Sequence, residues 1–430
     1  MKLILLELNE INFDYVNKYL DAGEKLEGFK TIINQGILNT YSEDEYSNLE
    51  PWIQWPSVHS GKTFKEHGVF RLGDFVNKDI EQFFEKIESA GYSVGAISPM
   101  NASNRLKNPA YFIPDPWTQT SSDGTFFSKS IASAVSQAVN DNSKSKLTKI
   151  TILNLCLAFI FLVNPFRFFK LTRYAIGSFR KPWRKALFLD MFLHEIHNTL
   201  FKRKNPNFST LFLNAGAHIQ HHYFFNSPHV KSSELCNPDW YIDNNEDPFL
   251  EMLKVYDLIL LDLIRMPDTE IIIATGLSQK PYDKLKFYYR LSDHSKFLND
   301  IGISFSSVVP RMTRDFLINF NSPSEAESAQ AILQTIMVDD KIRLFDEIDN
   351  RGSDLFVVLT YPDEVNNNTK FFIGEESVKL INYVDFVAIK NGEHQSKGFL
   401  YSSSGLNDIM PKNGSHVSEI YNTIVNYFLK

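Results

Sequence analysis

The 430-residue sequence is poor in cysteine, in net positive charge and in long apolar runs. Its two cysteines, Cys156 and Cys236, cannot form a disulfide framework or a CxxC zinc site, and so few thiols fit a reducing compartment. A formal net charge of −7 argues against nucleic acid as the main partner. No apolar run reaches the roughly 20 residues that span a bilayer. We therefore expect a cytoplasmic protein that does not bind nucleic acid.

What is present is a composition typical of a folded protein, with 43 % hydrophobic and 22 % charged residues. The 36 phenylalanines favour a large core, an apolar substrate or a membrane-facing surface, and composition does not separate these. The opening "MKLILLELNEINF" is apolar like a signal peptide, but Glu7 and Glu10 interrupt it. We expect a buried first strand there.

Short, continuously apolar runs alternate with helical segments along the chain. Continuous apolar character is typical of strands that are covered on both faces. The sequence therefore predicts an α/β fold with a mostly parallel central sheet flanked by helices. The predicted strands are "KLILLELN", "YSVGAISP", "STLFLNAG", "TEIIIATG", "DLFVVLTY" and "VDFVAIKNG".

Residues 121–205 interrupt this alternation. The apolar run "ITILNLCLAFIFLV" is followed by the basic and aromatic run "NPFRFFKLTRYAIGSFRKPWRK". We predict that 1–120 and 206–430 form the α/β core and that 121–205 is an inserted helical cap. A buried cap helix and a peripheral membrane contact through 150–185 both fit the insert, and a true transmembrane span is the remaining alternative.

Polar residues that follow predicted strands are the candidate site. Glu7 ends the first strand, Asn214 and His218 follow a middle strand, and His394 lies in a loop after a late strand. The carboxyl ends of parallel strands share one edge of a sheet, where ligands bind. Carboxylate oxygen and imidazole nitrogen together suit Zn²⁺, Mn²⁺ or a related divalent ion, so these residues are candidate ligands of a metal ion.

Four segments, in this order, carry a resemblance to a known family. They are the opening strand, "EPWIQWPSVHSGKTFKEHGVF", "LNAGAHIQHH" and "GEHQSKGFLYSSSG". Together they resemble the alkaline phosphatase superfamily, nearest to its type I phosphodiesterase and nucleotide pyrophosphatase branch. The resemblance implies that fold, a metal site and phosphoester chemistry, and it places metal ligands at Glu7, Asn214, His218 and His394.

The sequence also departs from that family's pattern. Glu7 and Asn214 stand where the family has Asp, and Pro51 stands at the position of its Thr or Ser nucleophile. "IIIATGLSQ" occupies the place of the family's S-D-H-G segment and contains neither Asp nor His. By this resemblance a second metal site is dismantled and a first site is retained, which implies one divalent ion, Zn²⁺ or Mn²⁺. The sequence "RLSDHSKFL" spells most of the missing motif, but it reads better as the capped start of a helix.

Other residues near these segments are candidates for chemistry or substrate binding. Glu50, beside Pro51, is the candidate catalytic carboxylate, as a nucleophile or general base. His222 lies four residues after His218 and shares its face on a helix, whereas His221 is expected to point elsewhere. The candidate substrate contacts are His222, Trp52, Gln54 and Thr275.

Two functions remain open at this point. The first is a metal-dependent hydrolase or transferase that acts on a phosphoester or phosphodiester, with a small-molecule, lipid-linked or glycan-linked substrate at the inner face of the membrane. The assembly of bacterial surface polysaccharide would be a natural setting. The alternative is a catalytically degenerate protein that keeps the fold for binding or scaffolding, which the missing nucleophile favours.

Overall fold

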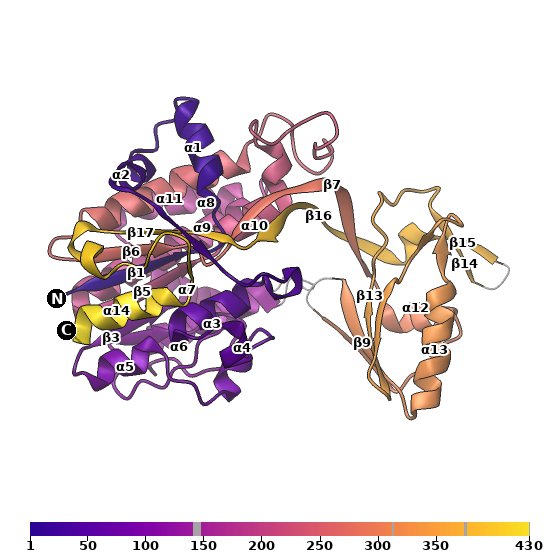
Figure 1. Cartoon of the computed structure of the whole chain (residues 1–430). Coiled ribbons are helices and arrows are strands. Elements are labelled where there is room, and N and C mark those ends of the chain that lie inside the picture. The colour runs from indigo at the N-terminus through magenta and orange to yellow at the C-terminus, as the bar shows by residue number, and fades with distance from the viewer. Residues whose placement is uncertain (141–147, 312–313, 374–375, 430) are drawn as a thin grey trace. The chain divides into compact units, whose positions relative to one another are not determined.

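The computed structural model describes residues 1–140, 148–311, 314–373 and 376–429. These residues form two compact units (Figure 1). The larger unit consists of Met1–Lys231, Asn245–Pro281 and Gly392–Lys430, and the smaller unit of Ser232–Asn244 and Tyr282–Asn391.

An eight-stranded sheet forms the centre of the larger unit, in the order β18–β2–β17–β6–β1–β5–β3–β4. The central strand β1 pairs in parallel with β5 and with β6, and β17 runs antiparallel to β6 and β2. The predicted mostly parallel sheet is therefore confirmed. The strands are β1 (Leu3–Leu8), β2 (Leu38–Tyr41), β3 (Val94–Ile97), β4 (Tyr111–Ile113), β5 (Phe208–Leu213), β6 (Glu270–Ala274), β17 (Lys397–Ser402) and β18 (Ser415–His416).

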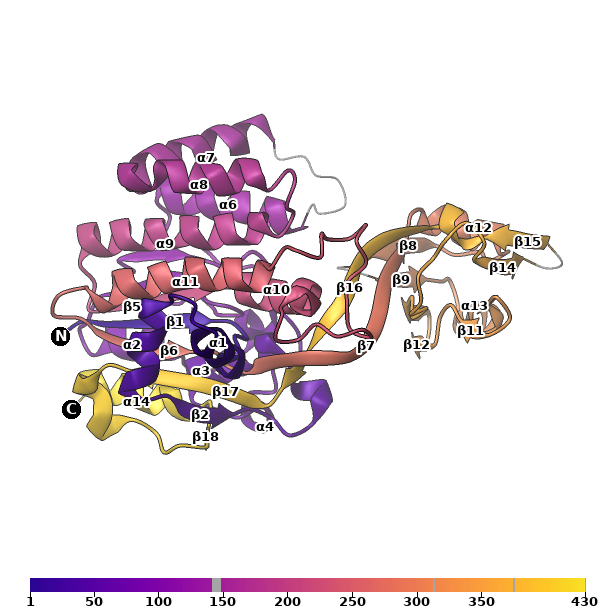
Figure 2. The ribbon, with the colours of Figure 1, turned by 90° about the horizontal axis from the view of Figure 1, so that it is seen from above.

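Helices cover both faces of this sheet, which explains why β1, β5 and β3 are buried at every residue. On one face, helices α3, α5 and α14 pack on a core that includes Phe83, Phe208 and Phe212. On the other face, α9 and α11 lie next to the sheet (Figure 2). The helices named so far are α3 (Pro51–Ser60), α5 (Phe83–Ser89), α9 (Arg184–Lys204), α11 (Pro248–Ile264) and α14 (Glu419–Leu429).

The segment 121–205 is helical where it is described. Helices α7 (Lys149–Leu162) and α8 (Phe168–Gly177) pack outside α9, and α6 (Phe126–Asn140) packs against α7 (Figure 2). Among the described residues, no single helix has the length and apolar composition to cross a membrane. Within the part of the chain that the structure describes, α7 and residues 165–177 pass that test as a pair, and the two are bent by 117°.

The remaining helices of the larger unit connect the strands. They are α1 (Phe13–Asp21), α2 (Glu27–Gln35), α4 (Phe64–His67) and α10 (Ala215–Tyr223). Helix α10 directly follows β5, so its first residues lie at the carboxyl edge of the sheet.

The smaller unit has a hydrophobic core of its own, which includes Phe297, Phe316, Leu355 and Phe371. One sheet of this unit has the order β12–β13–β9–β8 and a second has the order β11–β10–β14–β15. Its elements are α12 (His294–Asp300), β8 (Ser307–Pro310), β9 (Asp315–Asn319), α13 (Pro323–Thr335), β10 (Met337–Val338), β11 (Ile342–Arg343), β12 (Glu347–Asn350), β13 (Asp354–Val358), β14 (Lys370–Ile373) and β15 (Glu376–Lys379).

Our division of the sequence placed all of 206–430 in one core, whereas the structure groups 282–391 with the smaller unit. The apolar run at 354–361 was expected in the central sheet, but β13 pairs antiparallel with β9 and β12. A short apolar run shows that a strand is buried but not in which sheet. The strands β7 (Ser278–Leu291) and β16 (Val384–Gln395) pair with each other, and each has residues in both units.

Candidate metal centre

Three segments that are distant in sequence meet at the carboxyl edge of the central sheet. Glu10 lies two residues after β1, and His221 lies on α10, which follows β5. His394 lies near the end of β16, just before β17. Because β17 runs antiparallel to β6, it begins at the edge where β6 ends, and this brings His394 to the same place.

The side chains of Glu10, His221 and His394 converge there on one point. Glu10 Oε2 lies 3.1 Å from His221 Nε2 and 3.1 Å from His394 Nε2, and the two nitrogens are 3.2 Å apart. The Glu10 side chain is buried, and both histidines are half-buried.

Protons alone cannot satisfy these three contacts. A ring nitrogen carries at most one hydrogen. If both histidines donate to Glu10, their two N–H groups face each other, and if one accepts from the other, its lone pair loses the bond to the carboxylate. A cation between the three atoms removes this conflict. In a tetrahedral zinc site with bonds of about 2.0–2.1 Å the donor atoms are about 3.3 Å apart, which is close to the spacing here.

The electrostatics of the cluster agree with a carboxylate that is held ionised. Burial alone would raise the pKa of Glu10, but the neighbouring His394 and His221 lower it well below its usual value. For His394, burial alone would lower the pKa, and the carboxylates of Glu10 and Glu50 raise it above its ordinary value.

The backbone of Glu10 is held in an unusual conformation. Its φ of 64° lies in the left-handed region, which costs a residue with a Cβ roughly 1–2 kcal/mol. The Glu10 N–H donates to the carbonyl of Thr275, and its carbonyl accepts from Gln279 N and Gln220 Nε2. These three bonds fix the turn that sends the carboxylate over the sheet edge.

Carboxamides fix the Glu10 side chain in turn. Asn9 Nδ2 donates to Oε1 at 3.1 Å, and Gln279 Nε2 donates to Oε2. Asn9 is itself held by Trp55, whose Nε1 donates to Asn9 Oδ1 at 2.8 Å. A Cβ at Gly392 would lie 2.7 Å from the backbone carbonyl oxygen of Gln220, so only glycine allows β16 to approach this layer.

The start of α10 is fixed by two residues from neighbouring helices. Asp190 of α9 accepts from the backbone N–H of Ala215 at 2.7 Å, and Tyr256 of α11 accepts from that of Gly216 at 2.9 Å. Tyr256 also donates to Asp190 at 2.7 Å. Burial raises the pKa of Asp190 to about 6. This long-range cap sets the rotation of α10, and with it the direction of His221.

Glu50 lies behind His394. Its Oε2 is 3.5 Å from His394 Nδ1, and Glu50 is the residue that precedes α3, with Pro51 as the first helical residue. A carboxylate on the far nitrogen of a histidine fixes the ring and keeps the proton on that nitrogen. The Nε2 lone pair then points at the cluster.

Two of the predicted metal ligands lie elsewhere. Glu7 is fully buried inside the sheet, where Oε1 accepts from Thr210 Oγ1 at 2.6 Å and lies 3.2 Å from His59 Nε2. Asn214 Oδ1 accepts from Asn9 Nδ2 at 2.8 Å, the same group that donates to Glu10 Oε1. Because Glu7 is still within β1, its side chain must point to one face of the sheet, whereas Glu10 lies beyond the strand end.

The histidines of α10 do not face as we expected: His221 points to the cluster, and His218 and His222 do not. The rings of His218 and His222 lie 5.0 Å apart, as their spacing of four residues predicts. Neither belongs to the cluster, whereas the ring of His221 lies 5.0 Å from that of His394. Burial, together with the nearby His221, lowers the pKa of His218 to about 4. The spacing gave the pairing of the histidines but not the rotation of the helix.

The predicted substrate contacts are spread around the site. Trp52 is half-buried and its Nε1 donates to the Phe70 carbonyl at 3.2 Å. Gln54 is fully buried and donates to the Asn48 carbonyl at 2.8 Å. Thr275 is also fully buried, and its Oγ1 accepts from the N–H of Phe399. The N–H of Glu10 donates to the Thr275 carbonyl, so Thr275 helps to fix the backbone of Glu10.

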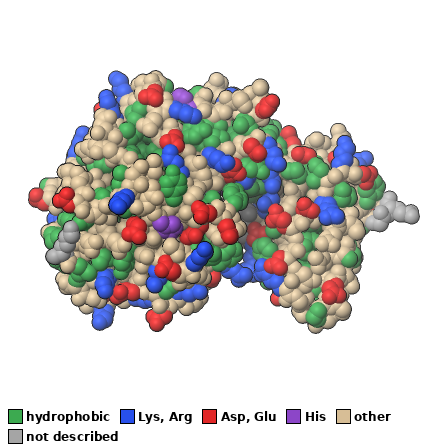
Figure 3. Space-filling view, in the orientation of Figure 1, with side chains coloured by type: hydrophobic (Ala, Val, Ile, Leu, Met, Phe, Trp, Pro, Cys, Tyr) green, Lys and Arg blue, Asp and Glu red, His purple; other side chains and the backbone are tan. Residues whose placement is uncertain are grey.

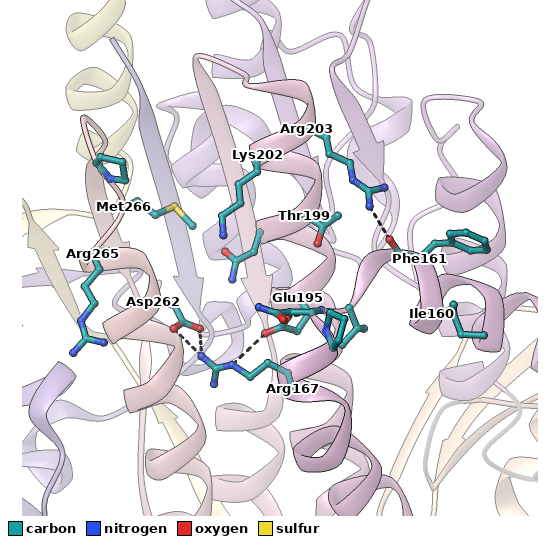
Figure 4. Close-up of a pocket in the computed structure, with 15 residues that line it drawn as sticks. Ile160, Phe161, Arg167, Glu195, Thr199, Lys202, Arg203, Asp262, Arg265 and Met266 are labelled. Atoms are coloured by element: carbon teal, nitrogen blue, oxygen red, sulfur yellow. Dashed lines mark hydrogen bonds and ion pairs between the residues drawn. The ribbon is translucent and has the colours of Figure 1, made fainter.

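A second group of acidic and histidine side chains, His194, Glu195 and Asp262, lies between α9 and α11. Arg167 occupies it: Nη2 donates to both carboxylate oxygens of Asp262 at 2.8 Å, and Nε lies 3.9 Å from Glu195 (Figure 4). The guanidinium therefore supplies positive charge to both carboxylates of this group. The "RLSDHSKFL" segment is also accounted for, because Asp293 caps α12 as expected.

Neither a family model nor a curated protein matches this sequence. Solved structures do match. Phosphonoacetate hydrolase from Sinorhizobium meliloti 1021 is 12 % identical with a TM-score of 0.43, over 100 % of this chain and 96 % of that one. Murine ectonucleotide pyrophosphatase/phosphodiesterase 5 is 11 % identical with a TM-score of 0.40, over 100 % and 95 %.

Alkaline phosphatase from the Antarctic bacterium TAB5 is 8 % identical with a TM-score of 0.41, over 100 % of this chain and 99 % of that one. These likenesses are distant, and the chemistry of the site follows from the chain's own residues.

Proposed function

We propose that this chain is a metal-dependent hydrolase or transferase that acts on a phosphoester or phosphodiester. Glu10, His221 and His394 would hold one divalent ion, with Zn²⁺ or Mn²⁺ as the best match to one carboxylate and two imidazoles. The observation that carries this proposal is the convergence of three donor atoms at 3.1–3.2 Å, which protons alone cannot satisfy.

A bound divalent ion would supply Lewis-acid chemistry by polarising a phosphoryl oxygen. The chain's own residues prepare the site. Glu50 holds the proton on His394 Nδ1, so that Nε2 is free to act as a ligand. Asn9 and Gln279 hold the carboxylate of Glu10 in one orientation. Trp52 and His222 are half-buried and remain proposed substrate contacts, while Gln54 and Thr275 are fully buried and act as supports.

The finer part of the proposal is a lipid-linked or glycan-linked substrate at the inner face of the membrane. It is supported by the basic and aromatic run 164–185, which belongs to the larger unit together with the cluster. An enzyme of surface-polysaccharide assembly would meet such a substrate there.

The test is metal content by elemental mass spectrometry on protein purified without a histidine tag. We expect about one ion per chain in the wild type, and its loss in His221→Ala and His394→Ala. The matched control is His222→Ala, one residue further along the same helix, which should keep the ion. Absence of any ion after loading with Zn²⁺ or Mn²⁺ would contradict the proposal.

A degenerate binding protein is the second candidate. Its support is Pro51, which forms the first residue of α3 where the family that the sequence resembles has a hydroxyl nucleophile. The same preparations separate the two candidates. Turnover of bis(p-nitrophenyl) phosphate or p-nitrophenyl phosphate that is lost in His394→Ala supports the enzyme. An ion that is retained without turnover of either ester supports the binding protein.

A further inference from the structure

Large apolar side chains are exposed in one short segment of the larger unit. Of the 21 exposed large apolar side chains among the described residues, nine lie between 150 and 179. Phe166, Phe169 and Phe179 are 94 %, 82 % and 88 % exposed. The others are Ile150, Ile152, Leu153, Ile160, Phe161 and Ile176. Single exposed apolar residues are ordinary, but a cluster of this size marks an interaction surface.

Helix α7 is packed against the protein on one side and has exposed apolar residues on the other. Its inner side is buried at Ala158 and Leu162. Its outer side carries Ile152, Cys156 and Ile160, which are spaced by four residues and exposed. A helix that is apolar on both sides is suited to lie between protein and a second apolar phase.

The charges of the same segment are of one sign. Residues 148–189 contain eight Lys or Arg and neither Asp nor Glu. Arg167, Lys181 and Arg184 pair with carboxylates of other elements. Among the described residues, no carboxylate lies within 4.0 Å of Lys170, Arg173, Arg180 or Lys185. In contrast, Figure 3 shows both signs of charge interspersed over the face of the larger unit that it presents.

A cavity of about 710 Å³ adjoins the apolar side chains. Ile160 and Phe161 of α7 line it, and so do Lys202 and Arg265 (Figure 4). Arg167 and Arg203 also line it, which makes four cationic side chains. The lining contains two carboxylates, Glu195 and Asp262, and both pair with Arg167. The surplus positive charge makes this cavity suitable for a phosphate group.

We propose that α7, α8 and the turn between them rest on an anionic phospholipid bilayer, with a lipid phosphate in this cavity. The aromatic side chains would enter the interface, and the unpaired cations would meet the headgroups. The one-signed charge favours lipid over a second copy of the chain, because two such surfaces repel each other. This inference does not depend on the metal centre.

The test is co-sedimentation with vesicles of phosphatidylcholine, alone or with about 30 mol% phosphatidylglycerol. We expect the wild-type chain to bind only the mixed vesicles and to be released at high salt. Equal binding to both vesicles, or binding to neither at low salt, would overturn the proposal. A second outcome would also overturn it: the wild-type chain binds no vesicles and forms a dimer in solution, and the dimer dissociates when Phe166, Phe169 and Phe179 are replaced by serine.

Two sets of substitutions separate the apolar and the charged contributions. Each should weaken binding to mixed vesicles at least tenfold: Phe166→Ser/Phe169→Ser/Phe179→Ser, and Arg173→Glu/Arg180→Glu/Lys185→Glu. Matched controls elsewhere should bind as wild type does: Phe372→Ser, and Lys62→Glu/Lys107→Glu/Lys412→Glu. All these side chains are exposed, so the variants should keep the thermal unfolding midpoint of the wild type. Lys202→Gln/Arg265→Gln tests the cavity and should reduce the preference for phosphatidylglycerol.

The two cysteines provide a measurement that does not rely on loss of binding. Cys156 is exposed on the outer side of α7, and Cys236 lies in the smaller unit. An environment-sensitive fluorophore on Cys156, in a Cys236→Ser background, should shift to the blue when mixed vesicles are added. The same label on Cys236, in a Cys156→Ser background, should not. Vesicle binding without any shift at Cys156 would show that another surface is used.

Discussion

Two clusters in the larger unit contain the same kinds of side chain and differ in what neutralises them. Glu10, His221 and His394 meet at the sheet edge, and His194, Glu195 and Asp262 meet between α9 and α11. In the second cluster, Arg167 supplies a permanent positive charge. In the first, no Lys or Arg among the described residues lies within 4.0 Å of the Glu10 carboxylate.

The comparison teaches that residue type and proximity do not by themselves define a metal site. The guanidinium of Arg167 donates to both oxygens of Asp262 and brings a positive charge within 3.9 Å of Glu195. In the sheet-edge cluster, hydrogen bonds cannot satisfy all three contacts between the carboxylate oxygen and the two ring nitrogens. The side chains of Asn9 and Gln279, rather than a cation, hold the carboxylate in place.

The largest effect is expected from removing a histidine of the first cluster. His394→Ala should weaken metal affinity by more than about 100-fold, because a metal ligand contributes more than a residue that only hydrogen-bonds to a ligand. His194→Ala, the matched change in the second cluster, should leave metal content unchanged. Titration with a fluorescent zinc indicator measures both. Equal losses in the two variants would mean that both clusters bind metal.

Removal of the guanidinium should destabilise the fold. Arg167→Met leaves Asp262 and Glu195 without their cation and should lower the free energy of unfolding by about 2 kcal/mol, less than for a fully buried pair. Arg173→Met, an exposed arginine of the same segment, should change it by less than about 0.5 kcal/mol. Urea unfolding at neutral pH gives both values. If the two variants unfold alike, the ion pair contributes nothing.

The carboxylate behind His394 should have a smaller effect. Glu50→Gln keeps the shape of the side chain but removes its charge from His394 Nδ1, and should weaken metal affinity by about 10–100-fold. The control is Glu45→Gln, five residues earlier, whose carboxylate accepts from Asn48 instead. If Glu50→Gln abolished turnover while metal affinity stayed at the wild-type value, Glu50 would be a reacting group rather than a positioning residue.

A histidine without a carboxylate partner provides the smallest effect. Burial lowers the pKa of His197 to about 3, and the neighbouring His194 adds to this. Below its ordinary pKa near 6.5, His197 is protonated in the unfolded chain and neutral in the folded one, so stability is lost as the pH falls. The loss is about 1 kcal/mol between about pH 6.5 and 5.5.

His197→Gln should remove this share of the acid sensitivity, although it lowers stability at every pH. The measurement is urea unfolding at the two pH values, and the quantity compared is the difference between them. His67 and His218 also have pKa values lowered to about 4 by burial, so the variant should keep part of the loss. An unchanged difference would mean that His197 is protonated in the folded protein.

The sequence predicted the parallel sheet and the edge at which the cluster lies, because both follow from apolar runs and from the polar residues after them. It also selected His394. It missed Glu10, although the same stretch contains it, because we chose the acid inside the strand rather than the one beyond it. The position of a strand's last residue decides between the two, and an apolar pattern fixes that position only within a few residues.

The helix histidines show a different limit. Periodicity relates His218 to His222 but does not say which side of α10 faces the sheet edge. Asp190 and Tyr256 decide that, and they come from helices that lie 25 and 40 residues from the N–H groups they bind. The smaller unit was missed for a similar reason, since its strands are short and apolar like those of the central sheet.

The left-handed turn at Glu10 has a consequence for how this chain can evolve. Glycine or asparagine would relieve the backbone at that position, and either would also delete the carboxylate. Selection for heat resistance alone should therefore drift toward Gly or Asn at position 10, whereas selection for metal retention should hold Glu there. Stability and metal binding therefore favour different residues at position 10, and a deep mutational scan under each selection would measure this difference directly.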